Sequence, residues 1–90
     1  MQIQNLEPVA DRGGGVKLLA LFDLQLTPEV RMHGMKLLQS PDGKCITYAA
    51  QSGPRRTATF ARSLAERITA AALKSYLEAT TAHDEPSQAV

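Results

Sequence analysis

The sequence predicts one α+β domain, in which an antiparallel β-meander of three to five strands is followed by one C-terminal helix. Three observations predict this fold. Residues 16–26 alternate with a period of two, which is typical of a strand with one buried face. Turn residues interrupt the chain at short intervals up to residue 57, as they do in a meander. From residue 64 onward, apolar residues recur at spacings of three and four, which indicates a helix.

The first element is the weakest, because residues 2–8 alternate only partly. A run of three glycines, residues 13–15, then interrupts the chain and predicts a hairpin turn. A phosphate-binding loop is the alternative, but it requires Gly-Lys followed by Ser or Thr and then a helix. Here the glycines are followed by Val16, Lys17 and a strand pattern.

Residues 16–26 form the clearest strand, with the even-numbered side chains apolar. Leu19 and Leu21 lie on the other face, so we expect the helix or a second subunit to cover the middle of that face as well. Residues 27–29 form the next turn, and residues 30–38 form the second strong strand.

The segment Ser40-Pro41-Asp42-Gly43 predicts a turn, with proline at its first central position and glycine free to take a positive φ. Residues 44–50 are the return strand, rich in residues that favour strands. A loop of three residues and a loop of four both fit this turn, and they differ by one residue in the strand register.

Residues 51–57 are expected to form a loop, and the helix is expected to run from residue 60 or 63 to about residue 80. Ser63 and Glu66 have the spacing of a capping box, in which both side chains bind backbone N–H groups at the helix start. Residues 81–90 have little to bury and predict a disordered tail. The folded domain is therefore expected to span residues 1–80.

A chain of 90 residues buries only about 60% of its unfolded surface, so a single copy is expected to be marginally stable. This favours a homodimer. Cys45 is the only cysteine, and residues 1–8 do not have the pattern of a signal peptide. The longest apolar run is far shorter than a membrane span. We expect a cytoplasmic protein without a membrane partner.

Cys45 and His33 are candidates for a nucleophile and its base, but their expected positions in the paired strands lie far apart. Cys45 lies opposite Leu38 or Gln39, which leaves His33 on the order of 17–20 Å away. His33, His83 and Cys45 also lack the short spacing of metal ligands. We therefore expect no enzyme activity, no metal, no cofactor and no small-molecule substrate.

The basic segment 55–74 is the strongest functional signal. It contains five basic residues and one acidic residue, a net charge of +4, so the rest of the chain carries −3. Such a concentration of positive charge is typical of a surface that contacts a phosphate backbone. The candidate nucleic-acid-binding residues are Arg55, Arg56, Arg62, Arg67 and Lys74.

A surface helix is also often basic for solubility, and Glu66 and Glu78 have the spacing to pair with Arg62 and Lys74. The alternative is therefore a homodimeric protein-interaction module without a nucleic-acid partner.

The patterns follow one another in a specific order, which one family shares. A strand at residues 17–26 is followed by a second strand that contains Val30, His33 and, three positions further on, a basic residue. A glycine turn, an apolar strand at residues 45–50 and a basic loop from Ser52 to Thr57 come next. In this order they resemble the stage V sporulation protein G family of septation regulators in bacteria. Ser63, Ile68 and Tyr76 are similar to the family's C-terminal helix, and the resemblance covers residues 16–78.

The resemblance implies a regulator that binds DNA and RNA, acts in transcription regulation, forms a homodimer through its sheet and needs no cofactor. Two departures stand out. The segment before the helix is shorter here and lacks the family's His-Pro-Ile stretch, and Ala65 stands where the family has a basic residue. If specificity depends on those residues, this protein binds other sequences or binds more weakly.

Overall fold

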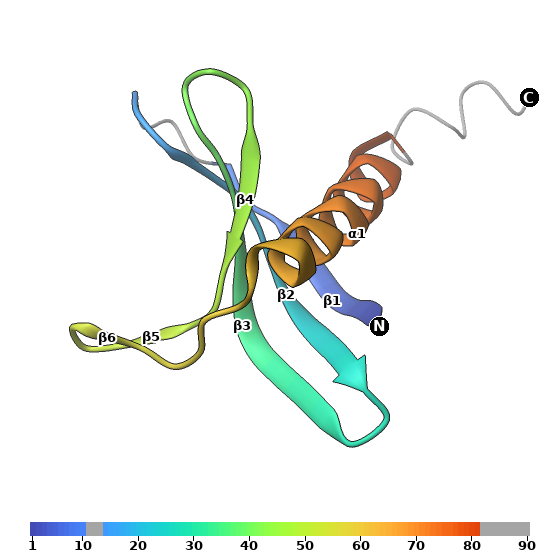
Figure 1. Cartoon of the computed structure of the whole chain (residues 1–90). Helices are drawn as coiled ribbons and strands as arrows, with labels where there is room; N and C mark the ends of the chain where they lie inside the picture. Colours follow the sequence, from blue (N-terminus) through green and yellow to red (C-terminus); the bar gives the residue numbers. More distant parts are fainter. Residues whose placement is uncertain (11–13, 82–90) are drawn as a thin grey trace, which may run out of the picture.

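The structure, a computed structural model, describes residues 1–10 and 14–81. It confirms the α+β class, with a four-stranded antiparallel meander in the order β1-β2-β3-β4 followed by one helix (Figure 1). A separate two-stranded sheet, β5-β6, lies between the meander and the helix in the chain. The elements are β1 Gln2–Pro8, β2 Lys17–Thr27, β3 Val30–Gln39, β4 Cys45–Tyr48, β5 Gln51–Ser52, β6 Arg55–Arg56 and α1 Arg62–Thr81.

The strand register that the sequence left open is now defined. Thr27 pairs with Val30, so a two-residue turn joins β2 to β3. Gln39 pairs with Cys45, and the Ser40 N–H donates to the Lys44 carbonyl at 2.8 Å, so the loop has three residues, 41–43, which is one of the two expected lengths. In that turn Gly43 has a φ of +91° and donates its N–H to the Ser40 carbonyl at 2.9 Å. Glycine takes this conformation without steric cost.

The core lies between one face of the sheet and α1. Ala20, Phe22 and Leu24 of β2 are buried there, as the alternation predicted, whereas Val16, expected on the same face, precedes β2 and is exposed. The largest buried side chains of the neighbouring strand are Met35 and Leu37. The helix crosses from β4 towards β1 and contacts all four strands. It contributes these core residues: Ile68 and Ala72, fully buried, and Leu64 and Tyr76, half-buried.

A hydroxyl pair links the helix to β4 within this layer. Thr47 is almost fully buried, and its Oγ1 lies 2.8 Å from Oγ1 of Thr69 on α1. A buried hydroxyl needs a hydrogen-bond partner, so this contact satisfies both groups and fixes the position of α1 over β4.

The opposite face of the main sheet, here called the outer face, is not covered by α1. Leu21 remains 37% exposed on it. Leu19, expected beside Leu21, lies instead at a bulge in the β2–β3 pairing and is half-buried in contact with the core. The expectation that the helix covers this part of the sheet is therefore wrong for Leu21, and its coverage by a second subunit stays a prediction.

Residues 51–57 form a short hairpin rather than the expected loop, with Gly53 at a φ of +62°, as the first central position of a type II′ turn requires. The helix begins at Arg62, between the two expected starts at residues 60 and 63. The Ala65 N–H donates to the Ala61 carbonyl at 2.9 Å, so Ser63 lies inside the helix and the expected capping box is wrong. Phe60 and Leu64, on either side of the helix start, both pack on the core.

The helix ends at Thr81, one residue into the segment expected to be a tail. The rest of that tail, residues 82–90, and part of the expected glycine turn, residues 11–13, lie outside the described residues. Within the described residues, α1 is too polar to cross a membrane, and it is the only helix there.

Candidate functional site

Arg55 and Arg56 both lie on β6, in the hairpin that extends away from the sheet and from α1 (Figure 1). Both side chains are exposed. The Arg56 guanidinium lies over the Tyr48 ring, with its central carbon 4.5 Å from the ring centroid. A two-stranded hairpin is only marginally stable in water, so this cation–π contact helps to hold it against β4.

The basic residues of α1 lie on two sides of the helix. Arg67 and Lys74 are exposed and seven residues apart, so they share one face. Arg62 is five residues before Arg67, which places it about 140° away around the helix axis. It lies towards β4, and its Nε is 3.8 Å from a carboxylate oxygen of Glu66.

The predicted residues therefore do not form one patch. Arg55 and Arg56 are together on the hairpin, Arg67 and Lys74 are together on one helix face, and Arg62 lies apart from both groups. Among the residues that the structure describes, Arg62 is the only one of the five in an ion pair. The pair is almost fully exposed, so it is weak.

A hollow of about 200 Å³ adjoins the hairpin on the outer face. Sequence reasoning missed it, because its members come from four different strands. Lys36 of β3 pairs with Tyr48 of β4, and Gln51 of β5 pairs with Arg56 of β6. The two registers that the sequence left open place Tyr48 opposite Met35 or opposite Lys36, and the structure selects the second. The hollow is lined by Lys36, Leu38, Tyr48, Ala49, Gln51 and Arg56.

A groove of about 640 Å³ separates the beginning of β4 from α1. Small and apolar side chains of the helix form its floor, namely Ala65, Ala70 and Leu73. Arg62 and Glu66 lie on its rim. Within the described residues β4 pairs only with β3, so its other edge faces the groove without a strand partner.

Asp23 occupies the middle of the outer face and binds both neighbouring strands. Its carboxylate accepts hydrogen bonds from Asn5 Nδ2 at 2.9 Å and from the Gly34 N–H at 3.4 Å, and His33 Nδ1 lies 3.4 Å away. Asn5 and Gly34 have positive φ values and lie at bulges. These contacts, Asn5 above all, hold the pKa of Asp23 below its usual value of 3.8.

The structure does not assemble a catalytic pair from Cys45 and His33. Cys45 is opposite Gln39, six residues along β3 from His33, or on the order of 20 Å. Cys45 is half-buried against the core, and burial raises the pKa of its thiol. His33 is beside Asp23 instead. Within residues 1–10 and 14–81, no cluster of three or more His, Cys, Asp or Glu side chains is arranged to hold a metal ion.

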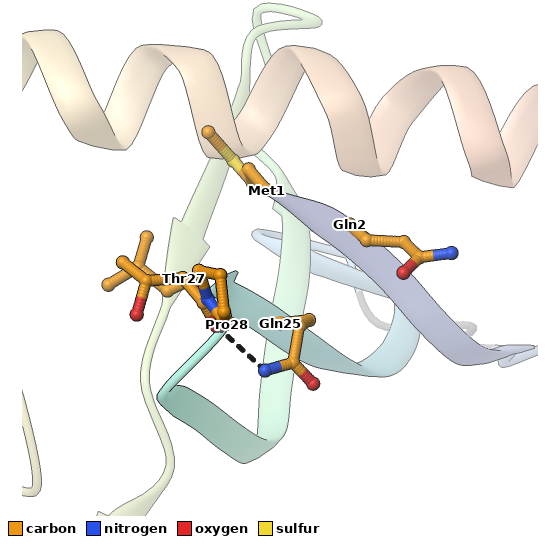
Figure 2. A pocket seen from close by; sticks show the side chains of 6 residues that line it. Met1, Gln2, Gln25, Thr27 and Pro28 are labelled. Carbon is orange, nitrogen blue, oxygen red and sulfur yellow. Dashed lines mark hydrogen bonds between the residues drawn. The ribbon is translucent and has the colours of Figure 1, made fainter.

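One further pocket, of about 520 Å³, lies beside the β2–β3 turn (Figure 2). Its lining side chains are uncharged, and the Gln25 amide donates to the Thr27 carbonyl at 2.7 Å. The lining contains no ionisable side chain that could act as acid or base beside the Thr27 hydroxyl, so the pocket supports no functional proposal.

Comparisons with models of protein families, with curated proteins and with solved structures found no match for this chain. The resemblance to the stage V sporulation protein G family therefore stays a prediction.

Proposed function

We propose that the protein is a regulator that binds DNA and RNA in the cytoplasm as a homodimer and contacts phosphates through its β5–β6 hairpin. The observation that carries the proposal is the position of Arg55 and Arg56, exposed on a hairpin that projects from the body of the domain. A guanidinium group presents its N–H donors in a fixed fork that matches phosphate geometry.

The two basic residues of the helix face extend this contact. Arg67 and Lys74 are about one and a half to two helical turns, or roughly 10 Å, apart, so they can meet successive phosphates of one backbone. The residue pattern shared with the stage V sporulation protein G family supports the same function. Arg62 has a different role in this proposal, because it lies on the rim of the groove towards β4.

The homodimer is proposed to form at the β4 edge. An unpaired strand edge is a template for pairing with another chain, and most soluble oligomers have twofold symmetry. In a twofold contact across the groove, Arg62 of one copy faces Glu66 of the other, and the reverse contact occurs as well. The apolar floor of the groove would be covered at the same time.

The test is a fluorescence-anisotropy titration of mixed-sequence duplex DNA and single-stranded RNA at several salt concentrations. Phosphate contacts release counterions, so log K should fall linearly with log salt by about 0.9 per contact for duplex and about 0.7 for single strands. Absence of binding at low salt would overturn the proposal.

The second candidate function is a protein-interaction module. The groove between β4 and α1 favours it, because an extended peptide can add to a free strand edge and place side chains against a neighbouring helix. In that case the basic side chains only keep the surface solvated. A folded protein that binds no nucleic acid even at low salt would support this candidate.

A further inference from the structure

The hollow on the outer face combines side chains that no single element supplies. Lys36 and Tyr48 belong to the main sheet, while Gln51 and Arg56 belong to the hairpin. The hollow therefore forms where the base of the projecting hairpin, the Gln51–Arg56 pair, meets β4. The contact between Arg56 and Tyr48 closes one side of it, and Tyr48 is still 37% exposed.

The side chains that line the hollow are of the types that bind bases and phosphates. It offers two cations, one aromatic ring and one amide, and none of the residues that line it is acidic. Aromatic rings and guanidinium planes are the surfaces on which unstacked bases are held. An amide both donates and accepts hydrogen bonds, which suits the edge of a base. A lysine ammonium acts as a point charge for phosphate.

We propose that this hollow binds one unstacked base of a single-stranded nucleic acid. The base stacks on the Arg56–Tyr48 pair, the Gln51 amide meets its edge, and Lys36 meets the adjoining phosphate. The face of the Arg56 guanidinium is used for stacking, so its N–H groups remain available for a phosphate. The bases of a duplex are stacked inside it and cannot enter, so the hollow selects single strands.

This inference rests on the proposed function and specifies its ligand, so its test separates the two. The probes are a fluorescent oligothymidylate strand and an abasic strand of the same length, which has the same phosphates but no bases. Wild type should bind the oligothymidylate about tenfold more tightly, or by about 1.4 kcal/mol, because one base stacked on side chains contributes an amount of this order. Both strands should show the same dependence on salt.

Tyr48→Leu should remove the preference for the base-bearing strand, whereas Tyr48→Phe, which keeps the ring, should retain it. Leu21→Ala is the matched control, because Leu21 is on the same face with the same exposure but does not line the hollow. A cooperative thermal melt of each variant shows that it is folded. Lys36→Gln should lower the salt slope and leave the preference for bases unchanged.

Three outcomes would overturn the inference. Equal wild-type affinity for the two strands, with a salt slope that Arg55→Ala still flattens, would reject the base site and leave the proposed function standing. Displacement of the strand by thymidine 5′-monophosphate at the same nucleotide concentration would assign the hollow to a free nucleotide. Failure of wild type to bind either strand would reject the site and the proposed function together.

Discussion

Asp23 shows how one side chain stabilises irregular backbone on both sides of a central strand. The strand on each side of it carries a bulge with a residue at positive φ, Asn5 on β1 and Gly34 on β3. Such conformations cost free energy for a residue other than glycine, so Asn5 needs compensation. The Asp23 carboxylate supplies it by accepting hydrogen bonds from both positions.

The dependence of the free energy of unfolding on pH should report the hydrogen bonds of Asp23. The folded-state pKa of Asp23 is below its usual 3.8, so its contribution is present above that value and is lost as the pH falls through the lower pKa. Asp23→Asn should be less stable than wild type at about pH 6, and the difference in the free energy of unfolding should shrink as the pH falls below 3.8 through the lowered pKa, as measured by urea unfolding. Glu29→Gln, an exposed control, should follow wild type. Parallel curves for Asp23→Asn and wild type would contradict the account.

The basic residues of α1 lie on two sides of the helix, which leads to a second prediction for single residues. Arg67→Ala should lower the log–log salt slope for duplex DNA by about 1.8 in a dimer, because the substitution removes one phosphate contact from each subunit. Arg62→Ala, on the other side of the helix, should leave the slope unchanged. Anisotropy titrations at several salt concentrations measure both. Equal effects of Arg67→Ala and Arg62→Ala on the salt slope would contradict the claim that phosphates are contacted from only one side of α1.

Single residues were predictable where they depend on local alternation. The burial of Phe22 and Leu24 follows from the period of two in β2. The bulge at Gly34 was not predictable, and the proximity of Lys36 to Tyr48 was only one of two alternatives, because both depend on the exact register of neighbouring strands. Pairing register is set by turn geometry and by the whole buried face, which a single strand does not reveal.

Among the elements, the helix was predicted in type and extent, but its cap was not. The Ser63 and Glu66 spacing fits a capping box, yet the helix already begins at Arg62, so Ser63 lies within its first turn. The hairpin was not predicted. Each of its strands has two residues, too few for an alternation pattern, and its stability depends on Tyr48, which lies outside it.

The attachment of α1 to the sheet can be tested at Ile68. Its side chain is fully buried, and such burial contributes roughly 1.5–3 kcal/mol. Ile68→Asp loses this and also buries a charge, a large loss against a total stability of about 5–15 kcal/mol. The variant should be unfolded by circular dichroism, whereas Leu77→Asp, at an exposed helix position, should melt cooperatively near wild type. Wild-type melting of Ile68→Asp would show that the helix does not pack as described.

At the scale of the whole molecule, one helix covers one face of a four-stranded sheet and leaves an outer face and a strand edge accessible. Leu21, Ile46 and Tyr48 are each 37% exposed on the outer face. A chain of this size buries a limited share of its surface alone, which favours association. We propose different occupants for the free edge and the hollow: a second copy of the chain and a single strand of nucleic acid.

The proposed dimer predicts a specific effect at the groove. Sedimentation at micromolar concentration should give twice the monomer mass of 9.7 kDa. Ala70→Glu places a charge on the apolar floor of the groove at an exposed helix position and should shift the protein to monomer. Leu77→Glu, exposed on the same helix but outside the groove, should remain a dimer. A monomeric wild type would remove the dimer from the account, and a dimeric Ala70→Glu would place the interface elsewhere.

The central claim is that the hairpin arginines bind phosphates, and the most direct test is the salt slope of the double variant Arg55→Ala, Arg56→Ala. The double substitution removes two phosphate-binding side chains from each subunit of a dimer, so it should flatten the log–log slope by roughly 3–4 for duplex DNA. The fold should persist, because surface substitutions usually change stability by no more than about 0.5 kcal/mol. A slope equal to that of wild type, in a folded double variant, would contradict the claim.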